Sequence, residues 1–286
     1  MMLWRGKGGC KFGLCAAVAI GIGAIAMLVS RPSFEPFPSE TALPGVSIGN
    51  NLPADYEASS IVWHPRLERF FLVCDEGIVS SMCNEGEDLR HWPIGGDLEA
   101  TTIACPQSDF IYIGGENPDR ISEFCVVTAS VTRRFELSDW MQGPNNGGLE
   151  ALAFVPDPDD PEGGLFYAGL QSNGSILVFR LPIASSTTST EVVYLRTIPS
   201  HDGVEDISAL HYAADHRTIY AIYDRSNLLR AMTPDGTVLR EWKLPGRNQE
   251  GLTFKGDAMY VCSDHGRKGG DVVRYAPFAG ITHPDE

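Results

Sequence analysis

Basic residues are scarce in this sequence of 286 residues. It contains 22 Lys and Arg against 37 Asp and Glu, a formal net charge of −15. Four of the basic residues lie within the first 31 positions, so the rest of the chain has 18 basic residues (22 − 4) against 37 acids, a net charge of −19. Nucleic-acid binding needs a basic surface, and this composition therefore argues against a nucleic-acid partner. The excess of acid is typical of a soluble exported surface, with a cation site as the more specific alternative.

Several catalytic and metal signatures are also missing. The sequence has no P-loop, no G-x-G-x-x-G and no H-E-x-x-H. Its seven cysteines form no C-x-x-C pair and no Cys/His spacing typical of zinc. Cys74 and Cys262 lie inside apolar runs, which favours buried free thiols over a disulfide between them. No motif therefore identifies a reaction.

A long helical period is lacking from residue 46 onward, where short apolar stretches alternate with turns rich in Gly, Asn, Asp and Pro. Five stretches each begin with an aromatic residue and reach a polar residue four positions later. They are 71–75, 112–116, 167–171, 220–224 and 260–264. Their starts are 41, 55, 53 and 40 residues apart, near the ~40–50-residue period of four-stranded propeller blades. The longer intervals contain insertions at 142–148 and 157–164, and at 184–190.

Each of these stretches predicts the second strand of a blade, and further strands follow it. Third strands are expected at 78–83, 121–127, 176–181, 228–232 and 272–277, and fourth strands at 89–94, 131–137, 192–198 and 238–244. The chain ends before a fifth blade gains its fourth strand, and residues 45–50 are expected to fill that place and close the ring. The sequence predicts an all-β, five-bladed β-propeller over residues 45–280.

The first strand of each blade shares an acidic motif. Glu250-Gly-Leu-Thr-Phe254 is repeated as Glu99-Ala-Thr-Thr-Ile103 and Glu150-Ala-Leu-Ala-Phe154. In the other two blades Ser59 and Ser208 replace the glutamate, and Glu57 and Asp206 stand two residues earlier. Because strand side chains repeat with a period of two, all five acids are expected on one side of their strands.

The starts of first strands and the ends of second strands meet on one face of a propeller, because the two strands are antiparallel neighbours. Nine carboxylates are therefore expected to converge there: Glu57, Glu99, Glu150, Asp206, Glu250, Asp75, Glu116, Asp224 and Asp264. Like charges so close raise one another's pKa unless a cation neutralises them. A ring of carboxylates suits Ca²⁺, which takes about 6–8 oxygen ligands in flexible geometry, better than octahedral Mg²⁺. The alternative is that each acid caps a turn or bonds a backbone amide, with no metal.

These motifs resemble the SdiA-regulated family of bacterial exported propellers. The resemblance rests on the E-[GA]-[LI]-[TA]-[YF] first strands, their serine variant and the second strands that end in an acid, and it covers residues 45–280. It implies an N-terminal membrane segment, a five-bladed propeller distantly similar to NHL repeats, and a calcium site. The second blade departs from the pattern, because Thr101 stands where the family has an apolar residue. The family has no settled biochemical activity, so the resemblance implies fold and metal rather than a reaction.

The N-terminal segment, residues 1–31, differs from the rest. Three basic residues precede an uncharged run at 12–30. At ~1.5 Å per residue this run would span about 28 Å, close to a ~30 Å hydrocarbon core. One interpretation is a single-pass anchor with its N-terminus in the cytoplasm and the propeller outside; the other is a cleaved signal peptide with Ala24-Ile-Ala26 at the cleavage site, leaving a periplasmic or secreted protein. A proline-rich linker follows at 32–44, and a tail is expected at 281–286.

Two functions fit these features. The first is a membrane-tethered calcium-binding propeller that binds a small molecule or protein at the channel mouth. The alternative is a calcium-dependent hydrolase, acting on lactones, esters or phosphoesters, in which the central metal polarises the substrate. A hydrolase also needs a base and a clamp for the substrate, and the sequence offers only His265, Arg225 and Arg267 near the expected mouth.

Overall fold

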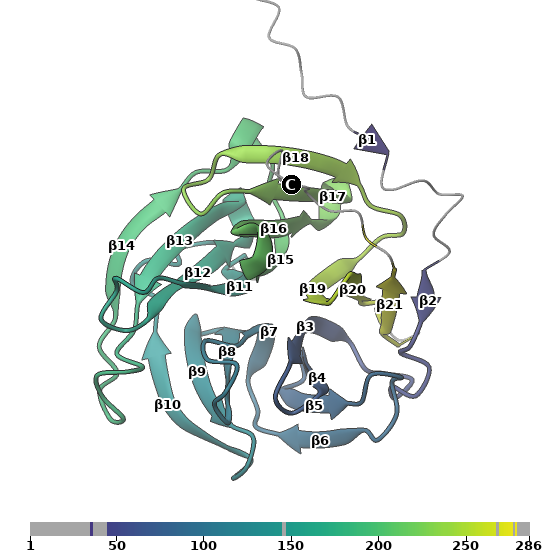
Figure 1. Ribbon diagram of the computed structural model, residues 1–286, viewed down its shortest axis with the longest axis horizontal. Helices are drawn as coiled ribbons and strands as arrows, with labels where there is room; N and C mark the ends of the chain where they lie inside the picture. Colours follow the sequence, from purple (N-terminus) through teal and green to yellow (C-terminus); the bar gives the residue numbers. More distant parts are fainter. Residues whose placement is uncertain (1–34, 37–44, 145–146, 267–268, 277, 279–286) are drawn as a thin grey trace, which may run out of the picture. The chain divides into compact units, whose positions relative to one another are not determined.

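The computed structural model describes residues 35–36, 45–144, 147–266, 269–276 and 278, all within one compact unit, Phe34–Glu286. These residues form five sheets arranged around a common centre (Figure 1). Short 3-10 turns occur at η1 (Gln171–Asn173), η2 (His201–Gly203), η3 (Ala214–His216) and η4 (Asp224–Ser226). Nowhere in the described ranges is there a helix long and apolar enough to cross a membrane, and the predicted membrane segment lies outside them.

Each sheet contains one blade of four antiparallel strands, and the strands that are consecutive in the chain run from the centre of the ring outward. The first blade contains β3 (Ala58–His64), β4 (Arg69–Cys74), β5 (Ile78–Met82) and β6 (Arg90–Pro93). The second contains β7 (Asp97–Thr102), β8 (Phe110–Glu116), β9 (Arg120–Cys125) and β10 (Ser130–Glu136). The third contains β11 (Leu149–Pro156), β12 (Gly164–Leu170), β13 (Ser175–Arg180) and β14 (Val193–Ile198). These strands confirm the predicted order and number of blades.

The last two blades recruit strands from the start of the chain. The fourth contains β15 (Ile207–Ala213), β16 (Thr218–Tyr223), β17 (Leu228–Met232) and β18 (Val238–Lys243), with β1 (Glu35–Pro36) parallel to β18. The fifth contains β19 (Gln249–Lys255), β20 (Ala258–Ser263), β21 (Asp271–Tyr275) and β2 (Val46–Ser47). The β2 strand is antiparallel to β21, and the Ile48 N–H donates to the Val272 carbonyl at 2.8 Å. The predicted closure of the ring by residues near the N-terminus is therefore confirmed.

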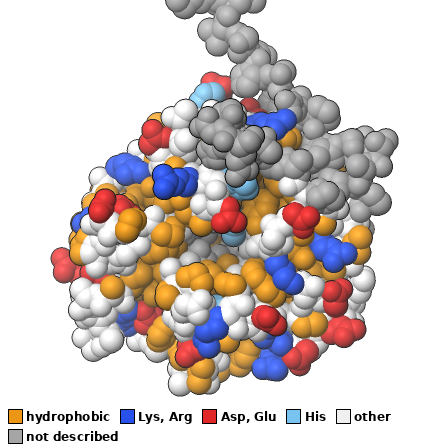
Figure 2. Space-filling model, viewed as in Figure 1, with side chains coloured by type: hydrophobic (Ala, Val, Ile, Leu, Met, Phe, Trp, Pro, Cys, Tyr) orange, Lys and Arg blue, Asp and Glu red, His pale blue; other side chains and the backbone are white. Residues whose placement is uncertain are grey.

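Hydrophobic side chains pack between neighbouring blades, so the core is distributed around the ring. Five buried clusters lie between blades one and two, two and three, three and four, four and five, and five and one. The innermost strands β3, β7, β11, β15 and β19 contact one another in that cyclic order. Figure 2 shows one face, on which hydrophobic side chains gather around the middle while many charged ones lie nearer the margin. Stability therefore depends on all five interfaces, including the one that joins the two ends of the sequence.

Hydroxyl side chains also link the innermost strands across blade boundaries. The backbone N–H of Thr101 donates to Ser60 Oγ at 3.1 Å, and that of Phe154 donates to Thr102 Oγ1 at 3.2 Å. Ser208 Oγ donates to the Gln249 carbonyl at 2.6 Å. Thr101, at which the second blade departs from the family pattern, and Thr102 are thus both buried next to partner strands.

Cys74 and Cys262 are buried free thiols in the cluster between the fifth and first blades, as the sequence predicts. Burial raises the pKa of the Cys74 thiol to about 12 and that of Cys262 well above its usual value. Because alkylating reagents attack the exposed thiolate, we expect Cys105, which is exposed, to react in the folded protein, and Cys74 and Cys262 to react only after unfolding. Mass spectrometry of alkylated peptides would measure this. Labelling of Cys262 in the native protein as fast as that of Cys105 would contradict it.

Candidate metal centre

The five innermost strands share a β-bulge at the position of the acidic motif. The register of each strand with its neighbour shifts around one extra residue: Ser59, Glu99, Glu150, Ser208 and Glu250. A bulge leaves its extra residue out of the ladder and re-aims that side chain. The equivalence of these five positions, inferred from the sequence motif, is therefore present in the backbone.

Glu57 and Asp206, the acids that precede the two serines, were expected on the first strands but lie just before them. Glu57 precedes the first residue of β3, and Asp206 precedes β15 with a φ of 69°. The period-two argument is therefore wrong for both, because neither is on a strand and a bulge intervenes before the next paired residue. Their position depends on backbone contacts instead, and the Asp206 N–H donates to the Gln171 carbonyl at 3.0 Å.

The starts of first strands lie beside the ends of second strands, as the topology predicts. Asp97 and Glu116 are direct partners in the β7–β8 ladder. The Asp224 N–H donates to the Asp206 carbonyl at 3.0 Å, and the Asp264 N–H donates to the Asn248 carbonyl at 3.0 Å. The structure thus places the nine predicted acids at the same end of their blades; their role as metal ligands stays a prediction.

Electrostatic coupling connects acids of different blades. Burial raises the pKa of Glu150 well above its usual value, and the charges of Glu99, Glu116, Glu250 and Asp206 raise it further. Glu150 belongs to the third blade and Glu250 to the fifth, which are not neighbours. Their interaction across the ring indicates that both side chains are near its axis.

The other acids show the same effect. Burial, followed by the charge and hydrogen bonding of Asp97, raises the pKa of Glu99 to about 9. Burial, followed by the charges of Asp224, Asp206 and Asp264, raises the pKa of Glu250 to about 8. Burial is also the main cause that raises the pKa values of Asp75, Glu116 and Asp224. Glu99 and Glu250 would therefore be partly protonated near neutral pH unless a cation were bound.

Four of the nine acids bond backbone amides. Glu116 Oε1 accepts from the Gly148 N–H, and Asp224 Oδ1 accepts from the Gln249 N–H at 2.8 Å, so both side chains bind the start of the next blade. Asp206 Oδ2 accepts from the Arg225 N–H at 3.1 Å, and Asp264 Oδ1 accepts from the Gly266 N–H at 2.5 Å, so these two side chains bond backbone within their own blades. These four side chains therefore do what the alternative to a metal site predicts, because each carboxylate bonds a backbone amide.

The remaining five are Glu57, Asp75, Glu99, Glu150 and Glu250. Within the described residues none of their carboxylates accepts a hydrogen bond from an N–H group, and Asp75 Oδ1 is a buried oxygen without any partner. Oxygens of Glu57, Asp75 and Glu76 lie within 4.8 Å of one another. A buried, unpartnered carboxylate oxygen beside two others fits a hard cation such as Ca²⁺, and the donor set contains only oxygen.

Some acids at this end were not selected from the sequence. Asp97 interacts with Glu99 and stands two residues before it, the spacing that singled out Glu57 before Ser59. Glu76 directly follows Asp75 and joins the cluster with Glu57. Asp119 Oδ1 accepts from the Leu149 N–H at 2.9 Å, which no sequence pattern indicated.

Candidate bases and nucleophiles are sparse among the described residues. His265 is exposed, with Nε2 3.2 Å from Ser263 Oγ. Arg225 Nη1 is 3.1 Å from Glu205 Oε2, and Arg267 lies outside the described residues. The letters of G-x-S-x-G do occur at 45–49, but Ser47 is on the closing strand β2 and its Oγ donates to Asp271 Oδ1 at 2.6 Å. A nucleophile elbow is a strand-to-helix turn, so Ser47 is not one.

The fold and this site define a five-bladed β-propeller whose innermost strands bring acids to one end of the ring. Residues 187–279 match the family model described as SdiA-regulated, the same family that the sequence motifs resemble. The crystal structure of Myxococcus xanthus glutaminyl cyclase is similar in fold, with a TM-score of 0.55 and 11% sequence identity over 77% of this chain and 90% of that chain. At that identity the likeness shows the fold alone. The comparison with curated proteins found no match.

Proposed function

We propose that this protein is an extracytoplasmic, membrane-tethered propeller that binds Ca²⁺ at the acidic end of the ring and a small-molecule or protein ligand beside it. The observation that carries the proposal is the set of five bulges, which places Glu99, Glu150 and Glu250 at equivalent positions near the axis. No described basic side chain pairs with any of these three. A bound divalent cation would neutralise them.

The five carboxylates without N–H donors are the proposed direct ligands, with Glu76 next to Asp75. The four carboxylates that bond backbone amides would orient the strand ends and add negative potential around the cation without contacting it. Such a division would give an asymmetric site, richer in ligands toward the first blade, where Glu57, Asp75 and Glu76 meet.

Calorimetric titration of the chelator-treated protein with Ca²⁺ tests the proposal. We expect saturable binding that is lost in Glu150→Gln, because the amide keeps the shape but removes a carboxylate that interacts with acids of several blades. Glu191→Gln is the matched control, since Glu191 is exposed before β14 on the outer side of the third blade. Absence of binding by the unsubstituted protein, or unchanged binding by Glu150→Gln and Glu191→Gln alike, would refute the assignment.

The membrane tether is proposed from the apolar run at 12–30, which carries no charge and follows three basic residues. If it is an uncleaved anchor, the full-length protein should stay with the membrane pellet after alkaline carbonate extraction. A soluble product whose N-terminus lies just after Ala26 would instead support the cleaved signal peptide.

The hydrolase alternative has less support. The glutaminyl cyclase of similar fold is an enzyme by its name, but a shared propeller does not carry a reaction with it. His265 is exposed and outside the set of coupled acids. Ca²⁺-dependent turnover of a lactone or phosphoester that is lost in Glu150→Gln would favour this alternative over a binding module.

A further inference from the structure

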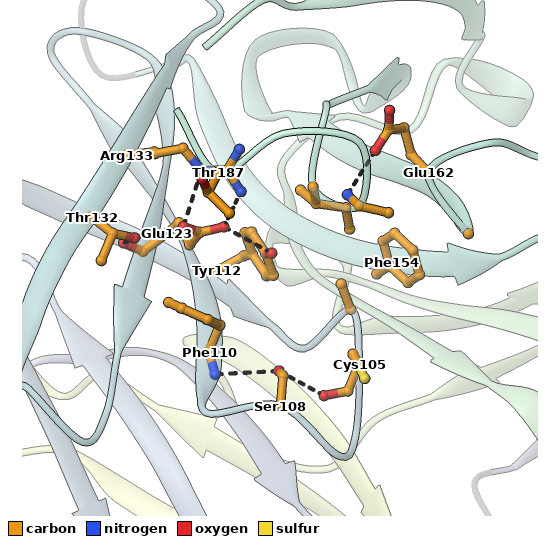
Figure 3. A pocket seen from close by; sticks show the side chains of 14 residues that line it. Cys105, Ser108, Phe110, Tyr112, Glu123, Thr132, Arg133, Phe154, Glu162 and Thr187 are labelled. Carbon is orange, nitrogen blue, oxygen red and sulfur yellow. Dashed lines mark hydrogen bonds and ion pairs between the residues drawn. The ribbon is translucent and has the colours of Figure 1, made fainter. Parts of the chain in front are cut away.

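A cavity of about 500 Å³ lies between the second and third blades (Figure 3). It is lined by Ala104 after β7, Phe110 at the start of β8 and Phe154 near the end of β11. The acids stand at the opposite ends of the same strands, so this cavity and the candidate metal centre open at different ends of the ring. Its volume falls in the range of about 300–1,000 Å³ that is usual for small-molecule sites.

The outer wall of the cavity is built by two insertions that lengthen the third blade. Residues 157–164 contribute Glu162 and Gly163, and residues 184–190 contribute Ala184 and Thr187. Apart from Gly164, the first residue of β12, the residues of both insertions lie outside the strands of the four-stranded sheet. The extra chain therefore forms a wall rather than completing a blade, as loops that build binding sites do.

Buried charges hold this wall in place. Glu162 Oε2 accepts from the Ala184 N–H at 2.7 Å and the Ser185 N–H at 3.0 Å. From the second blade, Arg133 Nη1 donates to the carbonyl oxygens of Pro182 and Ser186, each at 2.8 Å. The 184–190 insertion is thus tied to both blades, and the cavity is preformed.

The charged groups that line the cavity all have hydrogen-bond partners within the protein. Arg133 pairs with Glu123, and their side chains are only 5% and 6% exposed. Glu123 also accepts from Thr132 Oγ1 at 2.6 Å and from the Tyr112 hydroxyl at 3.2 Å, as Figure 3 shows. With Glu162, two carboxylates stand against one guanidinium, and an anionic ligand would find no free positive charge.

Apolar side chains provide the rest of the lining. Phe110, Tyr112 and Phe154 surround the cavity in Figure 3, and Ile183 and Ala104 add aliphatic surface. We propose that this cavity binds a neutral, mainly apolar small molecule, which contacts the aromatic rings and bonds only through its own hydroxyl or amide group. The site is independent of the proposed cation centre.

Two fluorescent probes with the same aromatic scaffold test the proposal. N-phenyl-1-naphthylamine is neutral, and 8-anilino-1-naphthalenesulfonate carries a sulfonate on that scaffold. We expect the neutral probe to bind the full-length protein saturably with one site per chain. The sulfonate should bind at least about tenfold more weakly, because its charge would be buried without a partner. A chelator should leave both results unchanged.

Matched Ala→Trp variants locate the binding. Ala184→Trp places a bulky side chain in this cavity and keeps the backbone N–H that Glu162 accepts; we expect it to weaken binding of the neutral probe by at least about tenfold. Ala214→Trp is the control, since Ala214 lines an adjoining hollow of about 150 Å³ and does not line this cavity, and the variant should bind as the unsubstituted protein does. Unfolding midpoints verify that both variants fold. Undiminished binding in Ala184→Trp, loss in Ala214→Trp alone, or equal affinity for the sulfonate would overturn the proposal.

Discussion

Ca²⁺ is expected to raise the thermal unfolding midpoint of the chelator-treated protein by about 5–10 °C. A ligand that binds only the native state at 100 times its Kd stabilises by ~2.7 kcal/mol, and each kcal/mol shifts the midpoint of a domain of this size by roughly 2–4 °C. The physical cause is the relief of repulsion among carboxyl groups whose pKa values burial and mutual charge have raised, Glu150 above all. Scanning calorimetry with and without excess Ca²⁺ measures the shift.

Glu150→Gln should abolish this shift and also raise the midpoint of the chelator-treated protein. The amide cannot ionise, so the apo form no longer bears the cost of burying a carboxyl group beside Glu99, Glu116 and Glu250, while the Ca²⁺ form loses a ligand. Glu191→Gln should leave both midpoints unchanged. An equal Ca²⁺ shift in Glu150→Gln, or a lower midpoint of its apo form, would contradict the assignment of this residue.

The chelator-treated protein is expected to lose stability as pH rises from about 6.5 to 9. Glu99 and Glu250 have folded pKa values of about 9 and 8, above the ordinary value of 4.5. In this window the native state therefore binds more protons than the unfolded chain, and the free energy of unfolding falls with increasing pH. The stability that these two groups contribute is complete below their unfolded pKa and is lost as pH rises through the folded values.

Saturating Ca²⁺ should remove or reverse this slope, because the cation binds the ionised carboxylates and its affinity increases as they lose protons. The range above pH 6.5 avoids His64 and His211, whose pKa values burial lowers and which destabilise the fold as they become protonated in acid. Denaturant midpoints at several pH values, with and without Ca²⁺, measure both slopes. Apo stability that stayed constant or rose between pH 6.5 and 9 would contradict the raised pKa values of these two carboxyl groups.

The strand plan was predictable because it depends on local patterns. The aromatic starts of the second strands at Phe71, Tyr112 and Tyr167 recur with the spacing of blades, and the alternation of apolar residues predicts strands directly. Closure of the ring also followed from the sequence, since the last blade lacked a fourth strand and residues 45–50 formed a short strand that belonged to no blade.

The details of the acidic end were less predictable. The motif identified Glu99, Glu150 and Glu250, but no sequence pattern predicted the bulge at each of them. A bulge arises from how two neighbouring strands pair. The sequence also could not separate Glu116, which bonds the Gly148 N–H in the next blade, from Asp75, whose Oδ1 has no partner. Both are acids at the end of a second strand, and only contacts across a blade boundary distinguish them.

By itself the sequence determined the five blades, their order, the closing strand and the set of acids brought to one end, because each depends on periodicity and on antiparallel neighbours. The tertiary structure decided which carboxylates are bonded to amides, how strongly burial raises their pKa values, and that two insertions of the third blade enclose a cavity against the second. Those properties depend on distances between residues far apart in the chain, such as Arg133 and Ser186, which no local pattern records.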